Sequence, residues 1–266
     1  MKIKDSIKVN SAKPEAVCFA VDPAVFAAST KQLQQPSLHT YGCLFSDQQS
    51  MNAALLRSGL YLYTQQGVVN DAAFLSSPYH KMVAGHDLMS NDLRRYLNAR
   101  SKDKRGITLK QQSAPVLAME QQFWHTFLLP KLKRKADFFL FAVFVRPALK
   151  ENLSHELLHA QYYQLPTLRH LLRDIWQHQV SAVDRATIIQ ALAKGGYDTR
   201  DQELVLREFL SYCLQYRAKS YVSRVKPLAT IAPLITKYAR IIVQTARQKG
   251  ITLISVEASD ASNPAA

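Results

Sequence analysis

Residues 138–160 have the sequence FFLFAVFVRPALKENLSHELLHA. The first eight, Phe138 to Val145, are all apolar, and their length and their phenylalanine and valine content predict a buried β-strand. Arg146 and Pro147 then turn the chain. The residues after the turn predict a helix from near Leu149 to about Tyr163. A buried strand, a short turn and a helix therefore follow one another.

The predicted helix carries the pattern His-Glu-x-x-His at His155, Glu156 and His159. Two histidines four residues apart lie on one face of a helix, so both imidazoles can reach a single ion at about 2.0–2.1 Å. Glu156 projects beside such an ion without binding it, where it can serve as a general base. The apolar neighbours of these residues favour this interpretation over an amphipathic helix whose histidines are ordinary surface or core residues.

A catalytic zinc site needs three protein ligands and one open position. The chain has Tyr162 and Leu165 where one class of zinc peptidase has a glycine and a third histidine, and it lacks the Gly-Thr-x-x-Asp pattern of another class. Between His159 and the C-terminal tail the only glutamates are Glu203 and Glu208. A glutamate from a later helix is the remaining common solution, which leaves these two candidates.

At this point the chain resembles the gluzincin group of zincin metallopeptidases, over about residues 137–220. The resemblance implies that His155 and His159 are zinc ligands, that Glu156 is the general base, and that a downstream glutamate is the third ligand. The resemblance also implies a zincin-like α+β fold, with a small sheet in the N-terminal half and a mainly helical C-terminal half.

Glu208 is the favoured third ligand, because the block Glu-Phe-x-x-Tyr from Glu208 to Tyr212 is similar to the glutamate helix of several small bacterial peptidases. Glu203 is the alternative. It follows Asp201 in the first turn of the predicted helix, where an acidic residue more simply stabilises the helix dipole.

Tyr212 stands where the best-known gluzincins have an aspartate that orients a ligand histidine. Its hydroxyl can instead stabilise the oxyanion of a tetrahedral intermediate, so we name it as a second catalytic residue; the competing interpretation is an ordinary packing tyrosine. The partner that orients the histidines is then expected elsewhere, from Asp174, Asp198 or a backbone carbonyl.

The sequence predicts three segments: a mixed α/β subdomain over residues 1–136, a strand with a helical zinc-binding subdomain over 137–256, and a disordered tail over 257–266. The first two are expected to form a single compact catalytic unit. Ala16 to Val21 and Gly59 to Thr64 predict strands. Phe138 to Val145 is expected at the edge of the sheet, where it would pair with extended substrate.

Four further helices are predicted in the second half of the chain. They begin at Pro166, after a cap at Ser181, after a cap at Asp201 and near Ile231. The second of them is expected to stop at the glycine pair at 195–196, the third at about residue 216 and the last at residue 248.

The chain carries 34 basic and 20 acidic residues, a net charge of +14. Such a balance can draw a protein toward nucleic acid, acidic proteins or anionic lipid. The basic runs, among them Lys131 to Lys135, lack the interleaved aromatics of single-strand binders, so we interpret them as solvated surface and expect no nucleic-acid partner. If Lys131 to Lys135 line a cleft, they favour acidic substrate.

Three widely spaced cysteines, Cys18, Cys43 and Cys213, argue against a disulfide framework and favour a reducing compartment. No stretch predicts a signal peptide or a membrane span. The expected location is the cytoplasm, or outside the cell as an effector exported by a secretion system that needs no signal peptide.

These features predict a zinc-dependent metallopeptidase that acts on a protein or peptide substrate and uses Zn²⁺ as its cofactor. The alternative is a non-enzymatic binding protein, either a degenerate zincin or a basic surface that binds nucleic acid or protein. Glu156 favours the enzyme, because a degenerate zincin usually lacks this glutamate or a ligand.

Overall fold

The structure is a computed structural model that describes residues 4–8, 16–22, 25–26, 38–63, 85–102, 115–134, 136–145 and 149–254. Within these ranges the chain is α+β, as predicted, with its sheet in the N-terminal half. None of the described helices is long and apolar enough to cross a membrane. The predicted disordered tail, 257–266, lies outside the described residues.

The chain divides into two compact units rather than one. The first unit comprises Met1–Asp22 and Ser37–Leu149, and the second comprises Pro23–Pro36 and Lys150–Ala266. The predicted boundary at residues 136/137 therefore lies too early. Strand β5 (Phe138–Phe144) hydrogen-bonds to the strands of the first unit, and these partners assign it to that unit.

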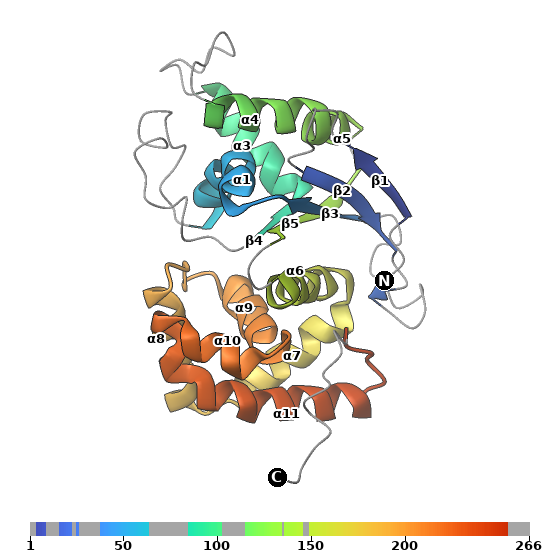
Figure 1. Cartoon of the computed structure of the whole chain (residues 1–266). Coiled ribbons are helices and arrows are strands. Elements are labelled where there is room, and N and C mark those ends of the chain that lie inside the picture. Colours follow the sequence, from blue (N-terminus) through green and yellow to red (C-terminus); the bar gives the residue numbers. More distant parts are fainter. Residues whose placement is uncertain are drawn as a thin grey trace. The chain divides into compact units, whose positions relative to one another are not determined.

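The first unit contains a five-stranded mixed sheet in the order β1-β2-β3-β5-β4 (Figure 1). The other strands are β1 (Lys4–Lys8), β2 (Ala16–Val21), β3 (His39–Phe45) and β4 (Gly85–Met89). Strand β5 pairs in parallel with β3 and antiparallel with β4. The prediction that β5 is an edge strand is therefore wrong, and neither of its edges can take up a substrate strand. Its seven residues are all buried, as is typical of a central strand.

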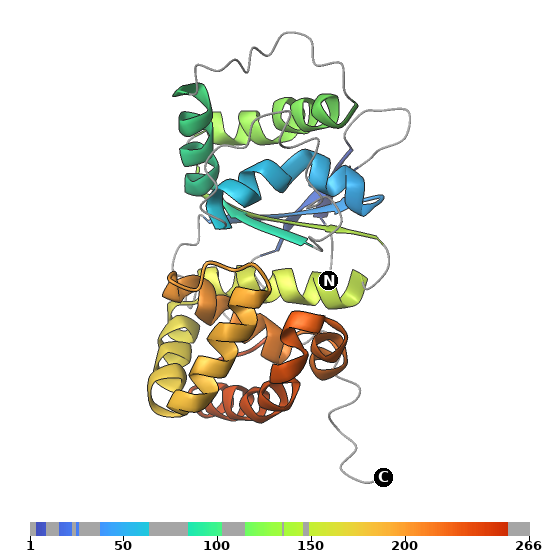
Figure 2. The same ribbon diagram turned by 90° about the vertical axis from the view of Figure 1, so that its left-hand side faces the viewer.

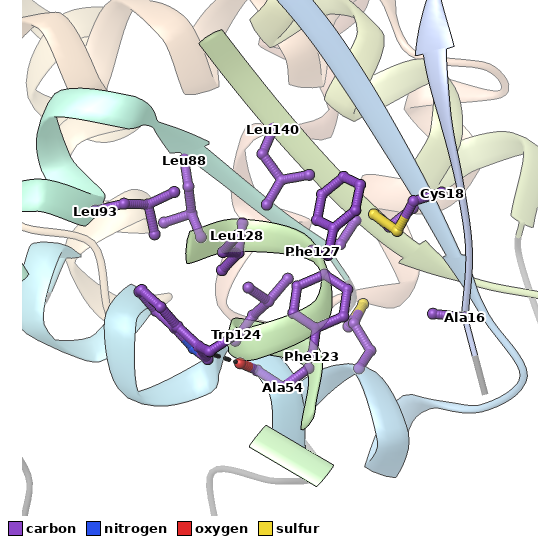
Figure 3. Packing of buried hydrophobic residues seen from close by; sticks show 14 of the residues in the cluster. Ala16, Cys18, Ala54, Leu88, Leu93, Phe123, Trp124, Phe127, Leu128 and Leu140 are labelled. Atoms are coloured by element: carbon purple, nitrogen blue, oxygen red, sulfur yellow. Dashed lines mark hydrogen bonds between the residues drawn. A yellow bond between two sulfur atoms is a disulfide. The ribbon is translucent and has the colours of Figure 1, made fainter. Parts of the chain in front are cut away.

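The helices of the first unit lie on one face of this sheet (Figures 1 and 2). They are α1 (Gln48–Tyr63), α3 (Ser90–Lys102), α4 (Pro115–Phe123), the π-helical segment η4 (Trp124–Leu128) and α5 (Leu129–Lys133). Figure 3 shows the apolar core between these helices and the sheet, where Trp124 donates a hydrogen bond to the carbonyl oxygen of Ala54 at 3.2 Å. The apolar residues of η4 thus join helix and sheet into one core.

The predicted strand from Gly59 to Thr64 is wrong, because residues 59–63 form the end of helix α1. Thr64 lies outside the described residues. The alternation of leucine and tyrosine there is too short to distinguish a strand from the end of a helix. Asp47 favours the helix, because its carboxylate accepts a hydrogen bond from the backbone N–H of Ser50 at 2.7 Å in the first turn.

Cys18 and Cys43 form a disulfide, which the sequence argued against. The two residues stand directly opposite each other in the antiparallel register of β2 and β3, and both are fully buried. Their sequence separation of 25 says nothing about this register, and so the pairing could not be inferred from spacing alone. Cys213 is free and buried.

The second unit is helical in its described part. Its helices are α6 (Leu149–Gln164), α7 (Pro166–His178), α8 (Ala182–Lys194), α9 (Gln202–Leu214), α10 (Ala218–Arg224), the 3₁₀ segment η5 (Lys226–Ile231) and α11 (Ala232–Gln248). The predicted caps are present: the Ser181 hydroxyl accepts from the N–H of Asp184, and the Asp201 carboxylate accepts from the N–H groups of Glu203 and Leu204. Helices α10 and η5 were not predicted.

Candidate metal centre

Helices α6 and α9 bring together the three residues expected to hold a metal. Nε2 of His155 lies 3.2 Å from Oε2 of Glu208, and Nε2 of His159 lies 3.4 Å from Oε1 of the same carboxylate. His159 and Glu208 are almost fully buried, whereas the side chain of His155 is 12% exposed. The group is therefore closed except beside His155.

The three groups lie close enough together to hold one metal ion, since one ligand atom from each lies within 4.8 Å of the others. The two nitrogen–oxygen distances, 3.2 and 3.4 Å, run to the two different oxygens of the Glu208 carboxylate. Two imidazoles and one carboxylate are also a common donor set for zinc with one position left open.

Ser211 contacts both the backbone of His155 and the ring of His159. The Ser211 hydroxyl donates its single proton to the backbone carbonyl of His155, at 3.3 Å, and its oxygen lies 3.1 Å from Nδ1 of His159. The tautomer in which Nδ1 of His159 donates to this oxygen leaves the lone pair of Nε2 facing Glu208, which is the form that a metal ligand requires.

Gln215 makes the corresponding contact with His155. Its amide oxygen lies 2.6 Å from Nδ1 of His155. An amide oxygen only accepts hydrogen bonds, so Nδ1 of His155 carries a proton. In the neutral ring this leaves the lone pair of Nε2 facing Glu208, where a cation would contact both imidazoles and the carboxylate.

The electrostatics of Glu208 agree with a need for positive charge. Burial raises the pKa of its carboxyl, but His159 and His155 lower it by more, so that the pKa lies well below its usual range. No described group donates a well-aligned hydrogen bond to its buried Oε2 atom. Two protonated imidazoles with ring centroids 4.6 Å apart would repel each other, whereas one divalent cation supplies the charge and leaves both rings neutral.

Glu156 and Tyr212 flank this group. Glu156 is buried, with a carboxylate oxygen within 4.8 Å of a ring nitrogen of His159. The ring of Tyr212 packs against that of His155, with centroids 4.8 Å apart, and its hydroxyl lies 2.7 Å from that of Tyr197. Burial and then the charge of Glu208 raise the pKa values of both tyrosines well above their usual range, so both hydroxyls keep their protons.

Glu203, the alternative third ligand, is bound elsewhere. Its carboxylate accepts hydrogen bonds from the Tyr162 hydroxyl at 2.7 Å and from Nε of Arg173 at 3.0 Å. The residues proposed to orient the histidines are also elsewhere: Asp174 pairs with Lys249 and Asp198 with Arg200. The geometry therefore selects Glu208 over Glu203 and does not use either aspartate.

Ser211 and Gln215, which do contact the histidines, were missed by the sequence analysis. They stand three and seven residues after Glu208, on the same face of α9. That spacing was the available signal, because any side chain on the Glu208 face beyond the carboxylate must also approach α6.

No known family model, curated protein or solved structure matches the chain.

Proposed function

We propose that this protein is a zinc-dependent peptidase of the gluzincin type, with His155, His159 and Glu208 as its metal ligands. The observation that carries the proposal is the convergence of two imidazole Nε2 atoms on one buried carboxylate at 3.2 and 3.4 Å. Two imidazole nitrogens and one carboxylate are a common donor set for a zinc ion that keeps one position open. When bound, a zinc ion supplies a Lewis acid that lowers the pKa of a coordinated water to about 7.

Glu156 supplies the proton chemistry in this proposal. Its carboxylate lies beside His159, on the same helix as two ligands but outside the three-residue group. From that place it can accept a proton from the attacking water and return it to the leaving amine. Cleavage of a peptide bond needs both transfers, because an amine leaves poorly without a proton.

Tyr212 and Tyr197 supply a hydrogen-bond donor. Their hydroxyls share a single hydrogen bond, at 2.7 Å, so one of their two protons remains to donate elsewhere. A buried hydroxyl that stays protonated can stabilise the oxyanion that develops on a peptide carbonyl. This supports the catalytic role predicted for Tyr212.

The proposal is tested by separating metal binding from hydrolysis. Purified wild-type protein should contain about one zinc per chain by elemental analysis, and His155→Ala, His159→Ala and Glu208→Ala should lose it. Glu156→Gln should keep the zinc but lose at least about 100-fold of the activity against quenched fluorescent peptide libraries, because only the base is removed.

Glu203→Gln is the matched control, since it changes a glutamate of the same helix that is bound to Tyr162 and Arg173. It should leave both zinc content and hydrolysis unchanged. Zinc retained by all three ligand variants would refute the metal centre. Hydrolysis by Glu156→Gln at close to the wild-type rate would refute the mechanism but not the centre.

A further inference from the structure

We propose that Gln215 is a positioning residue that holds His155 in its metal-binding state, and that the turn between α9 and α10 is built to place it there. The inference rests on the proposed metal centre. It assigns to an amide at the end of α9 the function for which the sequence suggested Asp174, Asp198 or a backbone carbonyl. Gln215 acts through His155 and does not bind the metal itself.

The turn that contains Gln215 is fastened to α6 on both sides of the contact. Before it, the Ser211 hydroxyl donates to the carbonyl oxygen of His155, and after it, the backbone N–H of Tyr216 donates to the Ser154 hydroxyl at 2.8 Å. Both partners on α6 are His155 or its immediate neighbour. The amide is therefore held against one particular ligand and not merely against the helix.

The buried amide of Gln215 is only half satisfied. The residue is 3% exposed, its oxygen contacts Nδ1 of His155, and no described group accepts a hydrogen bond from its nitrogen. A buried amide nitrogen without a partner is destabilising. An apolar side chain of the same size would pack at lower cost, so the bond to His155 is the interaction that the amide supplies here.

His155 has more need of such a partner than His159. The side chain of His155 is 12% exposed, against 2% for His159. An imidazole open to solvent can rotate or take the tautomer with its proton on Nε2, and in either state no lone pair faces the metal. A fixed acceptor at Nδ1 disfavours both states.

The backbone just beyond Gln215 is strained. Arg217 has φ 50° and ψ 38°, and it is the only non-glycine residue with positive φ in the part of the chain that the structure describes. Such a conformation is costly for a residue with a Cβ and persists where the surroundings fix it. Here it lets the chain leave α9 after Leu214 and enter α10 at Ala218, three residues after Gln215.

The test is zinc affinity, measured by competition with a chromophoric chelator. Gln215→Met keeps the length and volume of the side chain but removes the acceptor, and it should weaken zinc binding by about 10- to 100-fold. Gln215→Glu restores an acceptor for Nδ1 and should bind zinc within about threefold of wild type or more tightly. A merely structural role would not produce this rescue.

The matched control is Gln161→Met. Gln161 is a fully buried glutamine of α6 whose amide bonds to the backbone of Phe26, Thr252 and Ile254. This variant should lower the melting temperature without changing zinc affinity. The visible absorption of the cobalt-substituted protein gives a second readout, and its bands should move in Gln215→Met but not in the control.

Each outcome of these measurements supports or contradicts the proposed role of Gln215. Equal zinc affinity in wild type and Gln215→Met overturns the role of Gln215 and leaves the metal centre standing. Failure of the wild-type protein to bind zinc overturns the proposed function and this inference with it. If Gln215→Met does not fold, Gln215→Asn withdraws the acceptor by one methylene and carries the same expectation.

Discussion

The two units of the chain bury charged side chains in opposite ways. In the first unit Arg57 and Glu120 form a salt bridge between α1 and α4, and both side chains are almost fully buried. Each partner there neutralises the other. In the second unit the buried carboxylate of Glu208 faces two imidazoles, which carry positive charge only when they are protonated. The difference teaches that a buried carboxylate paired with a permanently charged guanidinium is fully compensated, whereas one that faces two imidazoles can bind a metal ion.

The largest expected effect on stability comes from breaking the Arg57–Glu120 salt bridge of the first unit. Glu120→Ala leaves the Arg57 guanidinium buried without its carboxylate, and it should lower the free energy of unfolding by about 3–5 kcal/mol, independently of zinc. Urea denaturation with and without zinc measures this.

The double variant Arg57→Met/Glu120→Leu is the control, because it removes both charges and fills the space with apolar groups. It should recover most of the loss, since an apolar pair is often as stable as a buried ion pair. A loss below about 1 kcal/mol in Glu120→Ala would mean that the pair is not isolated from water.

The next effect concerns His86, which is kept neutral inside the first unit. Burial lowers its pKa from the usual 6.5 to about 4, against the opposing charge of Asp87, and Nε2 lies 3.1 Å from the amide oxygen of Asn52. Between these values the unfolded chain binds a proton that the folded chain does not. The contribution of His86 to the free energy of unfolding is therefore fully present above pH 6.5. Below pH 6.5 it falls by about 1.4 kcal/mol per pH unit, which amounts to about 3 kcal/mol by pH 4.

His86→Gln removes the titrating group and should flatten this part of the pH dependence. The measurement is urea denaturation of both proteins at pH 4, 5 and 6.5. Identical pH slopes in wild type and variant would show that His86 takes up its proton without unfolding.

Much of the second unit could be predicted because its signals are local. The caps at Ser181 and Asp201 and the proline at the start of α7 all lie within one turn of the helix ends that they define. His155 and His159 share a helical face by spacing alone. These features depend only on residues close in sequence.

Apart from the strand predicted within α1 and the missed helices α10 and η5, the errors concern long-range placement. The Cys18–Cys43 disulfide depends on the register of β2 and β3, and the central place of β5 depends on β4, which comes from a distant part of the chain. The contacts of Ser211 and Gln215 with the histidines depend on how α9 packs against α6. Sequence spacing places Ser211 and Gln215 on the Glu208 face of α9, but it describes one element at a time and does not give the contacts between elements.

The smallest of the three effects, and the sharpest test of the comparison, is metal removal. Zinc that binds only the folded second unit should stabilise that unit by about 2.7 kcal/mol at 100 times its Kd, and a chelator should remove this increment.

The chain has two tryptophans, one in each unit: Trp124, in the core of the first, and Trp176, whose ring packs against Phe209 beside Glu208. Trp124→Phe leaves a reporter of the second unit, and Trp176→Phe leaves a reporter of the first. The chelator should shift the denaturation midpoint seen by Trp176 and leave that seen by Trp124 in place. Equal shifts would mean that the units unfold together, and no shift in either would mean that the second unit, like the first, compensates its buried charge without a metal.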